Sequence, residues 1–180
     1  MLKQDFLVEL GTEELPPKAL LKLSKSFQAG VIEGLKKESL AHGEVKSFAT
    51  PRRLAVLVCA LDQKQADRLT EKFGPAVKAA FDTHGNPTRA ADGFAKSCGV
   101  AVADLTRAPK DGVEKLSFSS TVPGKSTNEL LPAIVDAALA KLPIPKKMRW
   151  GSSRDEFVRP VHWLVMLFGE EVVPSTIMGV

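Results

Sequence analysis

The sequence predicts an α+β fold in which helices pack on a mixed or antiparallel sheet, and three observations lead to this prediction. Apolar, strand-like stretches lie near both ends of the chain, at residues 6–10 and 164–168. A long amphipathic helical pattern follows the first stretch directly. Residues at about 70–105 are rich in Ala, Gly and short polar side chains, which predicts a small helical subdomain between the strands. Strands and helices that do not alternate regularly are typical of α+β proteins.

The first strand runs directly into the first helix. Residues 6–10 are β-branched or apolar in rough alternation, and a Gly-Thr pair ends them. The Pro-Pro pair at 16–17 suits a helix entry, because a proline in the first turn has no intrahelical N–H bond to lose. Apolar residues then recur at helical spacing over 20–35, and five lysines lie among residues 18–37. We expect this amphipathic helix to end near 41–43 and to lie across one face of the sheet.

A hairpin and two small helices are expected next. Residues 44–49 and 53–61 read as strands joined by a short Thr-Pro turn, and the second strand is apolar on both faces, which favours a place inside the sheet. Within the Ala/Gly-rich unit, one helix is expected over 74–81. A second helix is expected over 88–98, with Thr88 as its N-cap.

The remaining elements are a second hairpin, a helix and a β-rich ending. Residues 106–111 and 114–122 predict strands that turn at an Asp-Gly pair, which is favoured where a hairpin needs positive φ. Ser126 is expected to begin a helix, because Glu129 three residues later completes a capping-box pattern. Residues 146–180 indicate short strands and turns.

Bulk properties exclude several classes of protein. The 180 residues are 44% hydrophobic and 26% charged, which is typical of a globular protein. A net charge of +4 permits an RNA partner, although acidic and basic residues are well mixed. Cys59 and Cys98 have no CxxC partner or nearby histidine, so neither a disulfide framework nor a zinc site is predicted. No apolar run reaches the ~20 residues of a membrane span, and no secretory signal begins the chain.

Acidic and basic residues gather at the ends of predicted strands. Glu9, Glu13 and Glu14 crowd the first strand-to-helix turn, where helix capping and surface pairing are favoured over acid–base or metal chemistry. Arg52 and Arg53 follow a Thr-Pro pair at the start of a strand. They could grip phosphates or a carboxylate, or they could form internal salt bridges, and the sequence leaves both interpretations open.

A second group of cations lies near the two tryptophans. Arg149 and Arg159, with Trp150 among them, resemble the mixture of cations and aromatic rings that holds single-stranded RNA. Trp163 is expected in the core, because it lies in a stretch that is apolar on both faces. His162 is expected to be a hydrogen-bonded core residue. The candidate RNA-binding residues are therefore Arg52, Arg53, Arg149, Trp150 and Arg159.

No catalytic residue and no metal ligand is predicted. The sequence contains neither a GxxxxGK[ST] nor a GxGxxG motif that could cradle a nucleotide. No Ser or Cys with an activating partner is indicated, so nucleophilic catalysis has no support.

Four phrases carry a resemblance to a known family. They lie at residues 6–20, 49–56, 148–151 and 157–163, and the first contains Glu-Leu-Gly-Thr-Glu-Glu-Leu-Pro-Pro at 9–17. Together, and in this order, they resemble the N-terminal part of the beta subunit of the bacterial two-subunit glycyl-tRNA synthetase. The chain ends inside an apolar, strand-like segment, so we expect a fragment of a longer multidomain polypeptide.

The resemblance implies a role in tRNA aminoacylation. With an alpha subunit, the complete enzyme would attach glycine to tRNA(Gly) using ATP and magnesium, in a cytoplasmic heterotetramer of two alpha and two beta subunits. Adenylation would belong to the alpha subunit, and this chain would supply tRNA handling and assembly contacts without binding a cofactor or a membrane. Two alternatives remain: a scaffold that touches no RNA, favoured if the arginines are buried in ion pairs, or a small-molecule or editing pocket.

Overall fold

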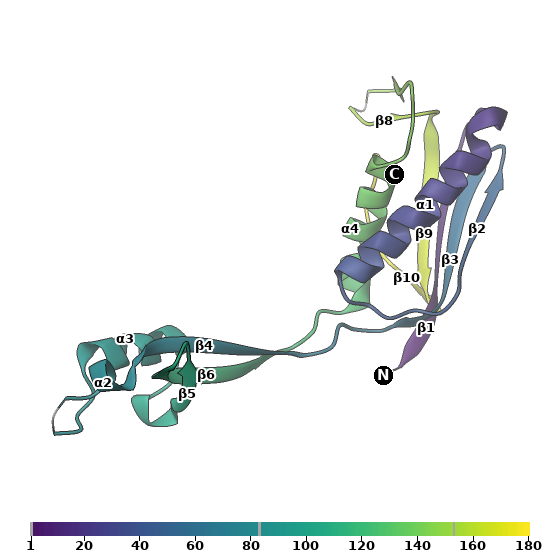
Figure 1. Ribbon diagram of the computed structural model, residues 1–180. Coiled ribbons are helices and arrows are strands. Elements are labelled where there is room, and N and C mark those ends of the chain that lie inside the picture. Colours follow the sequence, from purple (N-terminus) through teal and green to yellow (C-terminus); the bar gives the residue numbers. More distant parts are fainter. Residues whose placement is uncertain (1, 83, 153) are drawn as a thin grey trace. The chain divides into compact units, whose positions relative to one another are not determined.

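The computed structural model describes residues 2–82, 84–152 and 154–180 and has the predicted α+β fold (Figure 1). Among the described residues, all paired strands run antiparallel. The chain divides into two compact units, of which the main unit contains the chain up to Ala66 and from Gly124 onward. The second unit is Asp67–Pro123, and the small helical subdomain expected at about 70–105 falls within it.

The main unit is built on a five-stranded sheet with the order β10-β9-β1-β3-β2. Its strands are β1 (Lys3–Thr12), β2 (Val45–Thr50), β3 (Arg53–Asp62), β9 (Val161–Phe168) and β10 (Glu171–Val172). The pairing of β2 with β3 confirms the predicted hairpin. Because β1 also pairs with β9, segments from opposite ends of the sequence lie side by side.

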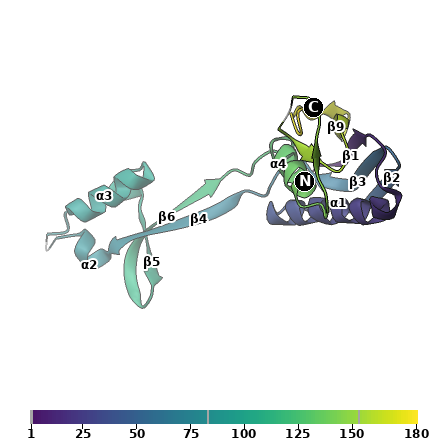
Figure 2. The same cartoon turned by 90° about the horizontal axis from the view of Figure 1, so that it is seen from above.

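Two helices, α1 (Pro17–Lys37) and α4 (Thr127–Ala140), cover one face of this sheet (Figure 2). The inward residues of the three central strands are buried against them, as the alternating pattern predicts. The expected helix over 20–35 is confirmed and its apolar stripe faces the sheet, but it ends at Lys37 and not near 41–43 as expected. The buried strand residues are Phe6, Val8, Leu10, Leu54, Val56, Val58, Met166 and Phe168.

The two helices approach each other closely at a glycine. A Cβ atom on Gly30 would lie 2.9 Å from the Cβ of Ala138 and 3.0 Å from its Cα. The small side chains therefore let α1 and α4 pack together while both cover the sheet. Among the described residues, no helix is long and apolar enough to cross a membrane.

The two chain segments on either side of the second unit are joined by hydrogen bonds within the main unit. The Gln65 N–H donates to the Lys125 carbonyl at 2.9 Å, and the Thr127 N–H donates to the Gln63 carbonyl at 2.9 Å. The Thr127 hydroxyl also donates to the Asp62 carbonyl at 2.6 Å. The chain thus leaves and re-enters the main unit at neighbouring positions.

The second unit has its own three-stranded sheet and small core. The sheet order is β4-β6-β5, from β4 (Arg68–Ala76), β5 (Thr106–Lys110) and β6 (Val113–Val122). Three short helical segments lie between β4 and β5, namely α2 (Val77–Ala80), α3 (Arg89–Cys98) and the 3₁₀ turn η1 (Val102–Asp104). Ala80, Ala91 and Leu116 are its buried apolar centre. Asp111 and Gly112 both have positive φ, which confirms the predicted hairpin turn.

One local prediction is wrong, and the helix expected to begin at Ser126 is confirmed without its capping-box hydrogen bond. The segment expected as a helix over 74–81 continues as strand to Ala76, and only Val77–Ala80 is helical. Pairing with β6 extends the strand, and an irregularity between Phe73 and Ala76 accommodates the proline there. Ser126 stands at the N-cap of α4 but makes no side-chain cap hydrogen bond. The neighbouring Thr127 anchors this helix instead.

Candidate functional site

Three of the four sequence segments singled out above, at residues 6–20, 49–56 and 157–163, meet at one end of the main sheet. There β1 ends, while β3 and β9 begin. Backbone hydrogen bonds join the three stretches: Thr12 N–H to the Arg52 carbonyl at 3.0 Å and Glu13 N–H to the Pro160 carbonyl at 3.0 Å. The Leu15 N–H also donates to the Pro51 carbonyl at 2.7 Å. Backbone hydrogen bonds therefore hold these loops together, in addition to any contacts between side chains.

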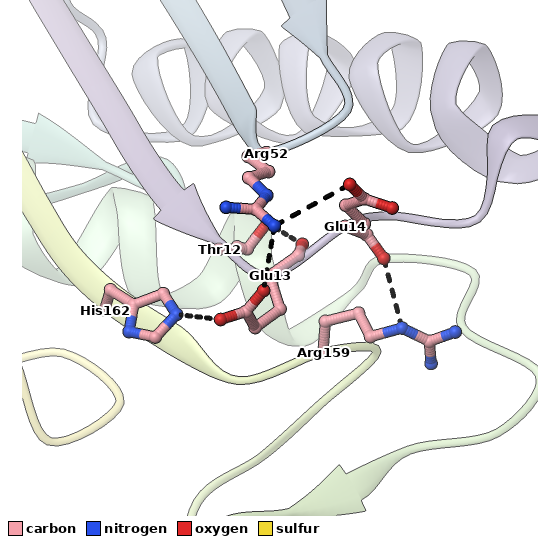
Figure 3. Close-up of polar contacts among 6 residues, drawn as sticks. All are labelled: Thr12, Glu13, Glu14, Arg52, Arg159 and His162. Atoms are coloured by element: carbon pink, nitrogen blue, oxygen red, sulfur yellow. Dashed lines mark hydrogen bonds and ion pairs between the residues drawn. The ribbon is translucent and has the colours of Figure 1, made fainter.

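Charged side chains form a small network on this frame (Figure 3). Arg52 lies 3.7 Å from Oε2 of Glu13 and 3.7 Å from Oε1 of Glu14. Nε2 of His162 is 2.9 Å from Oε1 of Glu13. The Arg159 Nε–H donates to the Glu14 backbone carbonyl at 3.1 Å. The glutamates thus make the surface pairs that the sequence favoured, since these side chains are exposed to solvent.

A tryptophan lies over the end of the sheet beside this network. Gly11 pairs with Arg53 of β3 on one side and with Trp163 of β9 on the other. A Cβ on Gly11 would overlap the Trp163 indole, so only glycine leaves room for the ring to lie across β1. The Arg53 guanidinium carbon is 5.3 Å from the ring centroid, and its Nη1 is 3.5 Å from Glu9.

These side chains surround an open cavity of about 410 Å³. It is lined by Thr12, Glu13, Thr50, Arg52, Arg53, His162 and Trp163. The lining combines cations, hydroxyls, a carboxylate and an aromatic ring. Such a mixture suits a polar or anionic ligand.

The structure places the candidate residues in two groups. Arg52, Arg53 and Arg159 come together around the network, whereas Arg149 belongs to the short hairpin of β7 (Met148–Arg149) and β8 (Glu156–Phe157). The Arg149 Nε–H donates to Glu156 at 2.8 Å. Trp150 is half-buried against the main core.

The expected positions of Trp163 and His162 are wrong. Trp163 is 38% exposed rather than in the core, because the helices cover only the opposite face of the sheet. An apolar pattern on both strand faces therefore did not mean burial on both. His162 is also exposed, although it is hydrogen-bonded as predicted. Its pairing with Glu13 joins residues 149 positions apart, and sequence reasoning missed it. The only signal was that both residues belong to the phrases at 6–20 and 157–163.

Metal-binding groups are not gathered anywhere in the described part of the chain. No cluster of three or more His, Cys, Asp or Glu side chains there could hold a metal ion. Cys59 and Cys98 are both free thiols.

Comparison with known proteins identifies related sequences along the whole chain. The model of the family "Glycyl-tRNA synthetase beta subunit" matches residues 6–180. A glycine–tRNA ligase beta subunit of Tolumonas auensis is 55% identical over 179 residues, which are 99% of this chain and 26% of that protein. The Marinobacter nauticus protein of the same name is 53% identical with the same coverage. That of Klebsiella pneumoniae is 52% identical over 180 residues, again 26% of its length. The chain thus spans about a quarter of these curated relatives.

Proposed function

The chain belongs to the glycyl-tRNA synthetase beta subunit family, and we propose that it serves tRNA handling and subunit assembly in a two-subunit glycine–tRNA ligase. The complete enzyme attaches glycine to tRNA(Gly) with ATP and magnesium, and adenylation belongs to the alpha subunit. This chain binds neither ATP nor magnesium. The complete enzyme is a cytoplasmic heterotetramer of two alpha and two beta subunits. The family match over residues 6–180 is the observation that carries the proposal.

The exposure of the candidate arginines supports tRNA handling over a pure scaffold. A scaffold role would favour arginines buried in internal ion pairs. Instead, the side chains of Arg52, Arg53 and Arg149 are 65%, 51% and 65% exposed. Exposed guanidinium groups can exchange a carboxylate partner for a phosphate at little cost, because surface ion pairs are worth only ~0–1 kcal/mol.

The first experiment asks whether this part of the beta subunit contacts tRNA at all. Amide hydrogen exchange of the complete two-subunit enzyme is measured with and without tRNA(Gly). We expect tRNA to slow exchange in peptides from residues 9–14, 50–53 or 158–163, which form the candidate site. If tRNA protects none of residues 2–180 while it protects other parts of the enzyme, the proposed tRNA role of this chain fails.

The second experiment tests a single arginine. Arg52→Ala in the complete enzyme should lower the dependence of log K on log salt by about 1 if Arg52 contacts a phosphate. Arg52→Lys keeps the charge and should keep most of that dependence. An unchanged salt dependence with a lowered melting temperature would instead favour the scaffold alternative.

A further inference from the structure

The solvent face of α1 carries an excess of positive charge outside the candidate site. The helix contains five lysines and a single acidic residue, Glu33. All five lysines are exposed to solvent. At 100° per residue, Lys18, Lys22, Lys25 and Lys36 fall within about 60° of one another around the helix axis. They form one stripe on the side of α1 that faces away from the sheet.

The four lysines of this stripe differ from Arg52, Arg53 and Arg149 in having no acidic partner. The Glu33 carboxylate is already paired at 2.8 Å with Lys141, which is the residue that follows α4. Within the described ranges, none of the four lysines of the stripe makes an ion pair, and Lys25 only reaches the Gln28 side-chain oxygen at 3.5 Å. Lys37, which lies outside the stripe, acts electrostatically on Glu33. Arg52, Arg53 and Arg149 each face a carboxylate. The α1 stripe is therefore a cationic surface that the protein leaves unneutralised.

The stability of the helix does not explain the first three lysines. The positive end of the helix dipole lies at the N-terminus, where acidic residues are favourable, yet the first turn contains none. Lys18 and Lys22 are four residues apart and Lys22 and Lys25 are three apart, spacings at which like charges repel. Lys36 and Lys37 lie in the last turn, where the dipole itself favours them. Only the N-terminal half of the stripe needs another explanation.

From these observations we propose that Lys18, Lys22 and Lys25 form an RNA-binding surface that contacts backbone phosphates. The inference rests on the proposed function, because it assigns a second place where the chain would meet tRNA. Lysine ammonium groups act as point charges, so the contact is to phosphates and carries no base sequence. Lysine is depleted in the centres of protein–protein interfaces, which favours a polyanion over an acidic protein surface as the partner.

The test uses the complete two-subunit enzyme with Lys18→Gln, Lys22→Gln and Lys25→Gln combined. Binding of tRNA(Gly) and of a second, unrelated tRNA is measured across salt concentrations. We expect the slope of log K against log salt to fall by about 2–3 for both tRNAs. Between 50 and 200 mM salt, the unmodified enzyme would then lose about 16–64-fold more affinity than the variant.

Two control variants isolate the charge of this stripe. The triple Lys→Arg variant keeps the positive charge and should retain the original slope. Lys46→Gln removes an exposed lysine that already pairs with Glu44 at 3.2 Å, so it should leave the slope unchanged. A slope that stays the same in the triple Gln variant overturns the proposal. So does an equal loss of slope in Lys46→Gln.

Two further measurements separate the remaining outcomes. If the triple Gln variant weakens association of the two subunits in the absence of tRNA, the partner is an acidic protein surface and the RNA proposal is overturned. In the hydrogen-exchange experiment, protection at 9–14 or 158–163 without protection in α1 leaves the proposed function standing and removes this inference. Protection in α1 together with the reduced slope supports both.

Discussion

Glu13 divides its carboxylate between two loops. Its Oε1 faces His162 at 2.9 Å, and its Oε2 faces Arg52 at 3.7 Å. Each partner comes from a different stretch of chain, so one side chain connects three. Because all three groups are about half exposed or more, these pairs contribute little to the free energy of unfolding. Their effect is to orient the Arg52 guanidinium and the His162 imidazole toward the same cavity.

Gly11→Ala is expected to destabilise the chain by about 1–3 kcal/mol, because the added methyl group overlaps the Trp163 ring and forces it to move. Thermal unfolding followed by tryptophan fluorescence checks this, since the displaced ring also changes its emission. A matched control is Gly93→Ala in α3, where the new Cβ meets nothing within 4 Å. That variant should be more stable by about 0.5–1 kcal/mol, because alanine favours the helix. Equal effects of the two variants would contradict the proposed packing of Trp163 on Gly11.

Asp82 is expected to stabilise its loop in a pH-dependent way. The backbone N–H of Asn86, donating at 2.8 Å, is the main cause that holds the pKa of the Asp82 carboxyl below its ordinary value of 3.8. Because the folded pKa is lowered, the stabilisation is present above the unfolded pKa and is lost as pH falls through the folded pKa.

Asp82→Asn should therefore lower the melting temperature at neutral pH, and the difference from the unmodified chain should shrink in acid. Melting curves recorded from neutral pH down to about 2–3 measure this difference. An NMR titration gives the pKa of Asp82 directly. A value at or above 3.8 would remove the basis of the prediction.

The two ends of α1 should respond in opposite directions to the same substitution. Lys18→Glu places an acidic residue in the first turn and removes a like-charge pair, so the melting temperature should rise. Lys36→Glu removes a favourable cation from the last turn, so it should fall. Exposed dipole interactions of this kind are worth ~0.3–1 kcal/mol each. If Lys18→Glu also weakens tRNA binding, then Lys18 lowers the stability of the helix but supplies positive charge that tRNA binding uses. A fall in melting temperature for Lys18→Glu would contradict that view.

Elements whose patterns are local could be predicted from the sequence. The amphipathic helix α1, the β2–β3 hairpin and the Asp111-Gly112 turn each depend on residues close together in the chain. After Gly74 the chain forms a strand where a helix was expected. This strand depends on pairing with β6, about 40 residues later, which the local composition does not indicate. The candidate residues could be predicted because they lie in distinctive short sequence segments. The Glu13–His162 contact could not be predicted in this way, because the pairing of β1 with β9 sets it. Trp163 was misplaced for a similar reason, since only the tertiary fold decides which sheet face the helices cover.

At the scale of the whole molecule, we predict that this chain alone does not activate glycine. Its sequence contains no nucleotide-cradling motif, and a beta-subunit fold does not by itself supply an adenylation site. Glycine-dependent exchange of pyrophosphate into ATP is the appropriate assay, with the complete two-subunit enzyme as the positive control. Exchange catalysed by the purified chain would overturn the assignment of this chemistry to the alpha subunit.

The hydrogen bonds from Gln65 to Lys125 and from Thr127 to Gln63 also bear on how such a chain can diverge in evolution. They fix the two ends of the 67–123 segment at neighbouring points, whatever that segment contains. When the ends of a loop are already adjacent, doubling its length costs only ~0.6 kcal/mol of closure entropy. Descendants of a common ancestor could therefore lengthen, shorten or rewrite this segment while the surrounding frame, with its Glu13 and Trp163, is inherited unchanged.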